Sequence, residues 1–188
     1  MKSVIYANVW QRLIANAIDG MIILVLMLII SSLAYIDFSI AFAAVLVSYL
    51  GLWYYGYYFH SRFGATLGKH IVGIIVVDND LNRFTESKAF KRSIIDMTFA
   101  ALGAGLGLTA LFAMDYNHFS SLPFFAREEY LEGFKLPIAS ICATAYGYWL
   151  LSECIVMQTN KQRKGLQDMI AGTKVIVKNP QHATIEVS

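Results

Sequence analysis

The sequence predicts an all-α polytopic membrane protein with four transmembrane helices and a small two-stranded β element on the cytoplasmic side. Of its 188 residues, 57% are hydrophobic and only 15% are charged, which is far more apolar than an average soluble domain. Four apolar segments are long enough to cross a bilayer core of about 30 Å. Positive charge is concentrated at the chain ends and in the central connection, as the positive-inside rule requires.

The first predicted helix, residues 10–36, begins with charged side chains. Arg12 and Asp19 are seven residues apart, a spacing that places them on one face of a helix. Ionisable groups at bilayer depth are costly, so they face protein or a wet cavity and find a partner. We therefore expect Arg12 to pair with Asp19 or with a carboxylate of a neighbouring helix. A cleaved signal peptide is less favoured, because the residues after the apolar run form a poor cleavage site.

The second predicted helix, residues 38–59, carries no charge. Its far end is crowded with aromatic side chains, namely Trp53, Tyr54, Tyr55, Tyr57, Tyr58 and Phe59. Rings with one wet edge favour the membrane interface. An aromatic belt is thus the preferred interpretation over a ligand-stacking site.

The connection after His60 is rich in Lys and Arg, which indicates that it is cytoplasmic. Within it, residues 71–77 are β-branched and short and precede the turn-like segment 78–82, so they predict a strand. A similar segment, residues 174–178, lies near the C-terminus. Neither strand is stable alone in water, and we expect them to pair into a small cytoplasmic sheet.

The third and fourth predicted helices, residues 87–114 and 136–158, repeat the pattern of buried charge. Arg92 and Asp96 are four residues apart on the third helix, and Glu153 lies about one turn from the inner end of the fourth. Both helices also carry small residues at the spacing that lets helices approach closely. These residues, which predict contact between the two helices, are Ala100, Gly103, Ala104 and Gly107 on the third and Ala139, Ala143 and Gly147 on the fourth.

Counting charges gives the orientation. With four spans and a cytoplasmic N-terminus, the inner segments hold thirteen of the fifteen Lys and Arg residues, the exceptions being Arg127 and Lys135. Both termini are then cytoplasmic, and the connection 115–135 lies on the outer surface. We expect one membrane domain over residues 1–180, followed by a tail at 181–188.

Two short motifs carry a family resemblance. They are Gly64-Ala65-Thr66-Leu67-Gly68-Lys69 and Gly165-Leu166-Gln167-Asp168-Met169-Ile170-Ala171-Gly172-Thr173. Together with Arg12 and Asp19, they make the chain resemble the RDD family of membrane proteins from about Tyr6 to Lys178. The resemblance implies a multi-pass protein of the bacterial cytoplasmic membrane. Its motif residues here are Gly64, Leu67, Gly68, Lys69, Asp168, Ala171, Gly172 and Thr173.

The family is named for one arginine and two aspartates, and the resemblance places these at Arg12, Asp19 and Asp168. Family members often carry His before the last aspartate, where this chain has Gln167. A role that needs a titrating imidazole at that position is therefore not expected. The family resemblance also brings suggestions of transport, with cation/proton antiport for some members.

The buried charges allow two functional hypotheses. The membrane-proximal set has one more negative than positive group: Arg12, Arg92, Asp19, Asp96 and Glu153. In the favoured hypothesis this set is a closed network that fixes helix register, and the protein is a structural or partner-binding membrane component. In the alternative, Glu153 takes up a proton or a monovalent cation, and the chain is an ion or small-solute transporter. Four helices are few for a complete carrier, so transport would require a homo-oligomer.

Several function classes are excluded. We find no nucleophile with its base, no metal-ligand spacing and no cofactor fingerprint, so we expect neither an enzyme, a metal site nor a bound cofactor. The Gly64–Lys69 motif lacks the spacing of a phosphate loop and indicates a turn leading into a strand. Cys142 and Cys154 are about 18 Å apart along a helix, beyond disulfide reach. A net charge of +2, placed as topology requires, does not indicate nucleic-acid binding, and the expected partners are the lipid bilayer and other membrane proteins.

Overall fold

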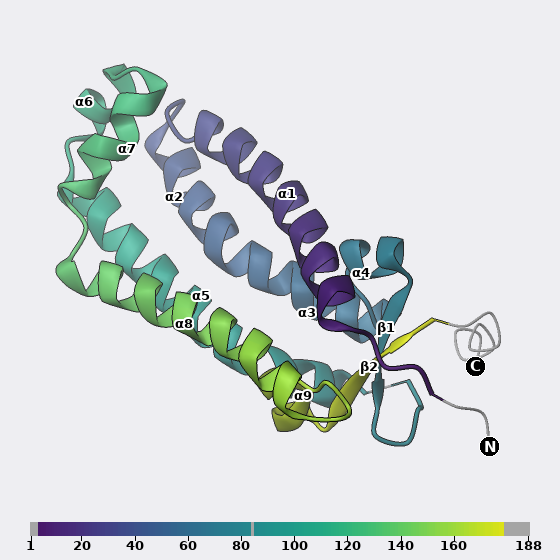
Figure 1. Cartoon of the computed structure of the whole chain (residues 1–188). Coiled ribbons are helices and arrows are strands. Elements are labelled where there is room, and N and C mark those ends of the chain that lie inside the picture. The colour runs from purple at the N-terminus through teal and green to yellow at the C-terminus, as the bar shows by residue number, and fades with distance from the viewer. Residues whose placement is uncertain (1–3, 84, 179–188) are drawn as a thin grey trace. The chain divides into compact units, whose positions relative to one another are not determined.

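The computed structural model describes residues 4–83 and 85–178 of the chain. Within these residues, four helices are long and apolar enough to cross a membrane, and the rest of the chain adds short helices and a two-stranded sheet (Figure 1). The predicted fold class is thereby confirmed, while the cytoplasmic position of the sheet stays a prediction. The long helices are α1 (Val9–Leu33), a second helix built from α2 (Phe38–Leu46), the π-helical turn η1 (Val47–Gly51) and α3 (Leu52–Phe63), then α5 (Glu86–Ala113) and α8 (Pro137–Thr159).

The described residues group into two compact units. The first, which we call the sheet unit, comprises the described residues of ranges 1–22, 55–95 and 148–188. The second, which we call the helical unit, comprises residues 23–54 and 96–147. Each long helix contributes residues to both units. We describe the two units separately.

The sheet unit contains the two predicted strands. β1 (Ile74–Asp78) and β2 (Thr173–Val177) are antiparallel, and Ile75 lies opposite Ile176. The segment before α1 lies along the other edge of β2, where Tyr6 forms a bridge with Ile176 and the Ala7 amide donates to the Val175 carbonyl at 3.1 Å. Residues from the beginning, middle and end of the chain therefore meet in one hydrogen-bonded layer.

Each strand is preceded by a short helix that the sequence did not predict. α4 (Leu67–Val72) ends at Gly73 and α9 (Leu166–Ala171) ends at Gly172, with φ of +74° and +65°. This left-handed conformation is the usual end of a helix at glycine. The strand predicted from residue 71 consequently begins only at Ile74, and the turn predicted at Gly64–Lys69 leads into α4 rather than directly into a strand.

A small apolar core supports the sheet. It combines inward-facing strand residues with small side chains from α1, α5 and the segment before α1, which lets these backbones approach the strands closely. Its buried members are Ala7, Ala15, Ile74, Val76, Ala89 and Val175. The first turns of α1, which carry the charged side chains, therefore pack directly beside the sheet.

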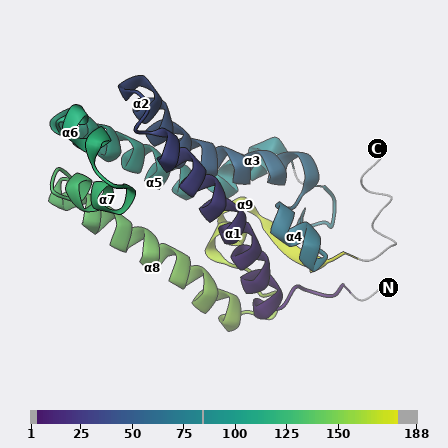
Figure 2. The ribbon, with the colours of Figure 1, turned by 90° about the horizontal axis from the view of Figure 1, so that it is seen from above.

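The helical unit contains the connection 115–135, which forms α6 (Tyr116–Ser121) and α7 (Phe124–Glu132). These two short helices lie side by side (Figure 2). Arg127 of α7 stacks over the ring of Tyr35 at 4.1 Å, and the Tyr116 hydroxyl donates to the Ala34 carbonyl at 3.0 Å. The connection is thus tied to the turn between α1 and α2.

The small residues of α5 approach the second long helix. A Cβ added at Gly103 would lie 2.5 Å from the ring of Tyr49, and one at Gly107 would lie 3.3 Å from the same ring. The predicted contact between the third and fourth long helices is present, because the ring centroids of Phe99 on α5 and Tyr146 on α8 are 5.1 Å apart. Gly103 and Gly107 themselves face the second long helix.

Candidate functional site

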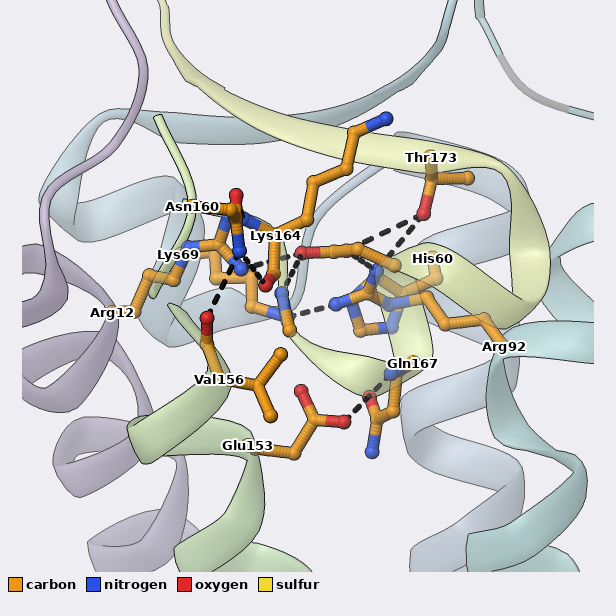
Figure 3. A network of polar contacts seen from close by, with 12 residues as sticks. Arg12, His60, Lys69, Arg92, Glu153, Val156, Asn160, Lys164, Gln167 and Thr173 are labelled. Carbon is orange, nitrogen blue, oxygen red and sulfur yellow. Dashed lines mark hydrogen bonds and ion pairs between the residues drawn. The ribbon is translucent and has the colours of Figure 1, made fainter. Parts of the chain in front are cut away.

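Asp168 is the centre of the charged network in the sheet unit. It lies in the first turn of α9 and is fully buried. Its Oδ2 accepts a hydrogen bond from Arg12 Nη1 at 2.6 Å, and its Oδ1 forms an ion pair with Arg92 Nη1. Figure 3 shows the two arginines entering this site from opposite sides. One carboxylate thus joins the beginning of α1 to the beginning of α5.

Neutral groups complete the surroundings of Asp168. The Gly165 amide donates to Oδ2 at 3.1 Å, and the Thr173 hydroxyl, which itself accepts from Arg92 Nη1, donates to Oδ1 at 3.3 Å. Burial by itself raises the pKa of Asp168, but the charges of Arg92 and Arg12 outweigh it and hold the pKa below its ordinary value. Asp168 is therefore ionised at neutral pH and bonded internally on both oxygens.

Asp19 is the second buried carboxylate of the sheet unit, and it forms no ion pair with Arg12. Its Oδ2 accepts from the Thr66 hydroxyl at 2.5 Å, and its Oδ1 accepts from the Gly68 amide at 2.8 Å and the Tyr55 hydroxyl at 3.0 Å. These donors come from α3 and from the start of α4. Of the two partners predicted for Arg12, the structure therefore shows the carboxylate of another helix, and Asp19 binds neutral donors instead.

Gly68 lets the donors reach Asp19. A Cβ at this position would lie 2.1 Å from the Ala15 carbonyl oxygen and 2.9 Å from Cγ of Asp19. Such contacts are impossible without a backbone shift. The glycine therefore allows α4 to lie against α1 (Figure 2), and its amide is then within hydrogen-bonding distance of the carboxylate.

Lys69, the next residue, is buried and bonded to a histidine. Its Nζ lies 2.8 Å from His60 Nε2 (Figure 3). His60 Nδ1 lies 2.6 Å from the Gly56 carbonyl oxygen. In the described part of the chain, no carboxylate oxygen lies within 4.0 Å of the Lys69 ammonium. Burial, with the charge of Arg92 as the next cause, lowers the pKa of Lys69 to about 7.

Glu153 and Asp96, the other two predicted charges, occupy different places. Glu153 is half-buried in the sheet unit, where its Oε1 accepts from the Gln167 amide at 2.6 Å. Its Oε2 would lie 1.9 Å from a Cβ at Gly165, so the carboxylate fits closely over the turn before α9. Asp96 is half-buried and belongs to the helical unit. Glu153 therefore fastens a turn of the sheet unit, whereas Asp96 belongs to the helical unit.

The remaining motif residues shape the backbone around these side chains. Gly64 has a φ of +69°, and its carbonyl accepts from the Val76 amide at 2.8 Å. Ala171 is buried beside the left-handed Gly172, whereas Leu67 is exposed. The first motif thus builds the turn that leads into α4, and the second builds α9 and the turn that leads from it into β2.

Sequence reasoning missed three side chains of the site. Tyr55 belongs to the aromatic end of the second long helix, for which the sequence predicts an interfacial belt. His60 marks the start of the predicted basic connection, and Thr66 lies in a motif interpreted as a turn. The indicative signal was the density of hydrogen-bonding groups in residues 60–69. In the described residues, no group of three His, Cys, Asp or Glu side chains could hold a metal ion.

Comparison with known proteins identifies the family. The sequence model of the RDD family matches residues 6–172, which is most of the chain. The chain belongs to the RDD family. The matched region contains Arg12, Asp19 and Asp168, the three residues that the resemblance singled out. No curated protein and no solved structure matches the chain, so the function of this RDD protein is inferred from the geometry of its own site.

Proposed function

We propose that this RDD protein is a structural, partner-binding component of the membrane, without enzymatic activity. In this proposal the buried charges fasten the ends of the membrane helices to the sheet. The observation that carries it is that Asp168 and Asp19, the two most buried carboxylates of the sheet unit, accept hydrogen bonds from fixed internal donors. Their oxygens are occupied by the protein itself.

The energetics of buried ion pairs support this role. An ion that exchanged at Asp168 would have to displace a guanidinium, because each carboxylate oxygen is bonded to one arginine. Breaking a buried pair by removing one partner costs about 3–5 kcal/mol, since it leaves an uncompensated charge. A site built in this way holds a fixed geometry, and repeated exchange of an ion would disrupt it.

The proposal includes the orientation in the membrane. The Lys and Arg distribution, with thirteen of fifteen on the inner segments, supports a bacterial cytoplasmic membrane with both termini in the cytoplasm. The sheet unit, which contains the charged network, then faces the cytoplasm. A membrane-protein partner would meet it there.

The test is ion flux together with partner capture. Purified protein in liposomes is assayed for Na⁺, K⁺ and proton flux, with and without an imposed pH gradient, and native membranes are cross-linked before purification. We expect no flux above that of protein-free liposomes and a membrane-protein partner in stoichiometric amount. Flux by the purified chain would contradict the structural role.

Cation/proton exchange by a homo-oligomer is the second candidate function. The observation that favours it is the buried Lys69–His60 pair, since a lysine without a close carboxylate can release its proton near neutral pH. Glu153→Gln serves as the discriminating variant in the same flux assay. An exchanging Glu153 predicts loss of pH-dependent flux, whereas a turn-fastening Glu153 predicts a change in thermal stability alone.

A further inference from the structure

We propose that Lys69 and His60 together form a binding site for one exchangeable proton. The site lies beside the carboxylate network and uses neither of the aspartates that name the family. Proton binding goes beyond the structural role proposed above. It also stands independently of whether the protein transports ions.

The hydrogen bonds fix how many protons the pair can hold. His60 Nδ1 faces the Gly56 carbonyl oxygen at 2.6 Å, an acceptor, so Nδ1 carries the hydrogen. His60 Nε2 is then the unprotonated nitrogen, and it accepts a hydrogen bond from Lys69 Nζ at 2.8 Å. If Lys69 Nζ and His60 Nε2 were both protonated, their N–H groups would point at each other, and two positive charges would lie 2.8 Å apart. The pair therefore holds a single positive charge at most.

Neutral lysine preserves the same geometry. An amine still has N–H groups to donate to His60 Nε2, so release of the proton from the Lys69 ammonium to water breaks no hydrogen bond of the pair. Proton uptake and release therefore do not require the Lys69–His60 hydrogen bond to break.

The charged groups around Lys69 come from three other helices. Arg92 of α5 and Arg12 of α1 disfavour the ammonium, while Asp168 of α9 and Asp19 of α1 favour it. Asp168 already neutralises much of the field of the two arginines, because it is bonded to both. Burial of Lys69, which is 8% exposed, then decides the balance and brings its pKa to about 7.

Proton release changes the charge of the site. With protonated Lys69, the cations Arg12, Arg92 and Lys69 face the anions Asp168 and Asp19, and the sum is +1. Loss of the proton brings the sum to 0. The site around the two aspartates thus takes up one positive charge as a proton when the cytoplasmic side is acidified.

The experiment is a proton titration of the purified full-length protein in lipid nanodiscs. The difference between wild type and Lys69→Met should correspond to one proton per chain, with a midpoint near pH 7. Lys91→Met, which removes an exposed lysine of the same region, is the matched control and should leave the curve unchanged between pH 5.5 and 8.5. His60→Leu removes the acceptor of the ammonium and should lower the midpoint by about one pH unit, since a hydrogen bond to a charged group is the stronger kind.

Two results would overturn the proposal. The first is identical titration of wild type and Lys69→Met over this pH range, and the second is a midpoint that His60→Leu leaves unchanged. If Lys69→Met does not fold, the ¹⁵N resonance of the Lys69 side chain in the wild-type protein replaces it. That resonance should move with a midpoint near pH 7, and a resonance that stays at its ammonium position up to pH 9 would refute the proposal.

Discussion

At the scale of single residues, the two buried aspartates have different kinds of partner. Asp168 bonds two guanidinium groups, and Asp19 bonds two hydroxyls and an amide. A carboxylate between two arginines is strongly favoured in its charged form. The stability of the sheet unit should therefore depend on pH through Asp168.

Acidification should destabilise the protein through this residue. The pKa of Asp168 is below its ordinary value in the folded protein and about 4 in the unfolded chain. Its stabilising contribution is therefore fully present above about pH 5 and is lost as the pH falls toward the folded pKa. The melting temperature of the wild type should fall as the pH is lowered from 7 to 3, and that of Asp168→Asn should fall less. Asp80→Asn, a change at an exposed loop residue, is the control, and its melting temperature should depend on pH as that of the wild type does.

The sequence predicted which charges enter the helices but not how they pair. Helical periodicity places Arg12 and Asp19 on one face because both belong to one element. It carries no information on Asp168, which is 156 positions from Arg12 and lies on a six-residue helix. The pairing depends on tertiary contacts that no local pattern contains.

At the scale of elements, the chain uses the same arrangement twice: a six-residue helix, a left-handed glycine and a strand. The strands could be predicted because β-branched residues cluster in them. The helices could not, because six residues complete fewer than two turns and show no hydrophobic periodicity. The first strand was predicted too early for this reason.

Gly68→Ala tests how α4 is placed. The added Cβ would lie 2.1 Å from the Ala15 carbonyl oxygen, so α4 must move away from α1 and weaken the hydrogen bond to Asp19. We expect the free energy of unfolding to fall by at least about 1–3 kcal/mol, which is the usual cost of overpacking. Thermal unfolding in detergent measures it. Gly20→Ala is the control, since nothing lies within 4 Å of its added Cβ, and an equal loss in both variants would contradict this account.

Gly103→Ala tests the packing of α5 against the π-helical turn. The added Cβ would lie 2.5 Å from the ring of Tyr49, so this ring must shift. We therefore expect the free energy of unfolding to fall by about 1–3 kcal/mol. Gly105→Ala, with nothing within 4 Å, should instead stabilise the helix slightly because alanine is the better helix former. Chemical or thermal unfolding of the two variants gives the comparison. A stable Gly103→Ala protein would show that this contact is loose.

At the scale of the whole molecule, hydropathy and segment length were sufficient for the fold class. Crossing a bilayer demands long apolar helices, and this demand is local, so the sequence contains it in full. The glycine contacts of α5 could not be predicted in the same way. Small-residue spacing shows that a helix can be approached closely, but not which neighbour approaches it.

Cysteine labelling tests the topology. Cys142 and Cys154 are replaced by Ser, and single cysteines are placed at Ser120, Asn79 and Gln181, the last of which lies outside the described residues. With both termini cytoplasmic, a membrane-impermeant thiol reagent added to intact cells should label position 120 and leave 79 and 181 unlabelled. All three should react after the cells are opened. Labelling of position 79 from outside would overturn the orientation.

The central claim, that the buried charges fasten the structure, is tested most directly by thermal unfolding of two variants at pH 7. Asp168→Asn leaves Arg12 and Arg92 buried without their counter-charge. It should lower the free energy of unfolding by about 3–5 kcal/mol. The triple variant Arg12→Gln, Arg92→Gln, Asp168→Asn removes all three charges together, and it should be more stable than Asp168→Asn, because no lone charge stays buried. A triple variant that is as unstable as Asp168→Asn, or an Asp168→Asn protein as stable as the wild type, would contradict the claim.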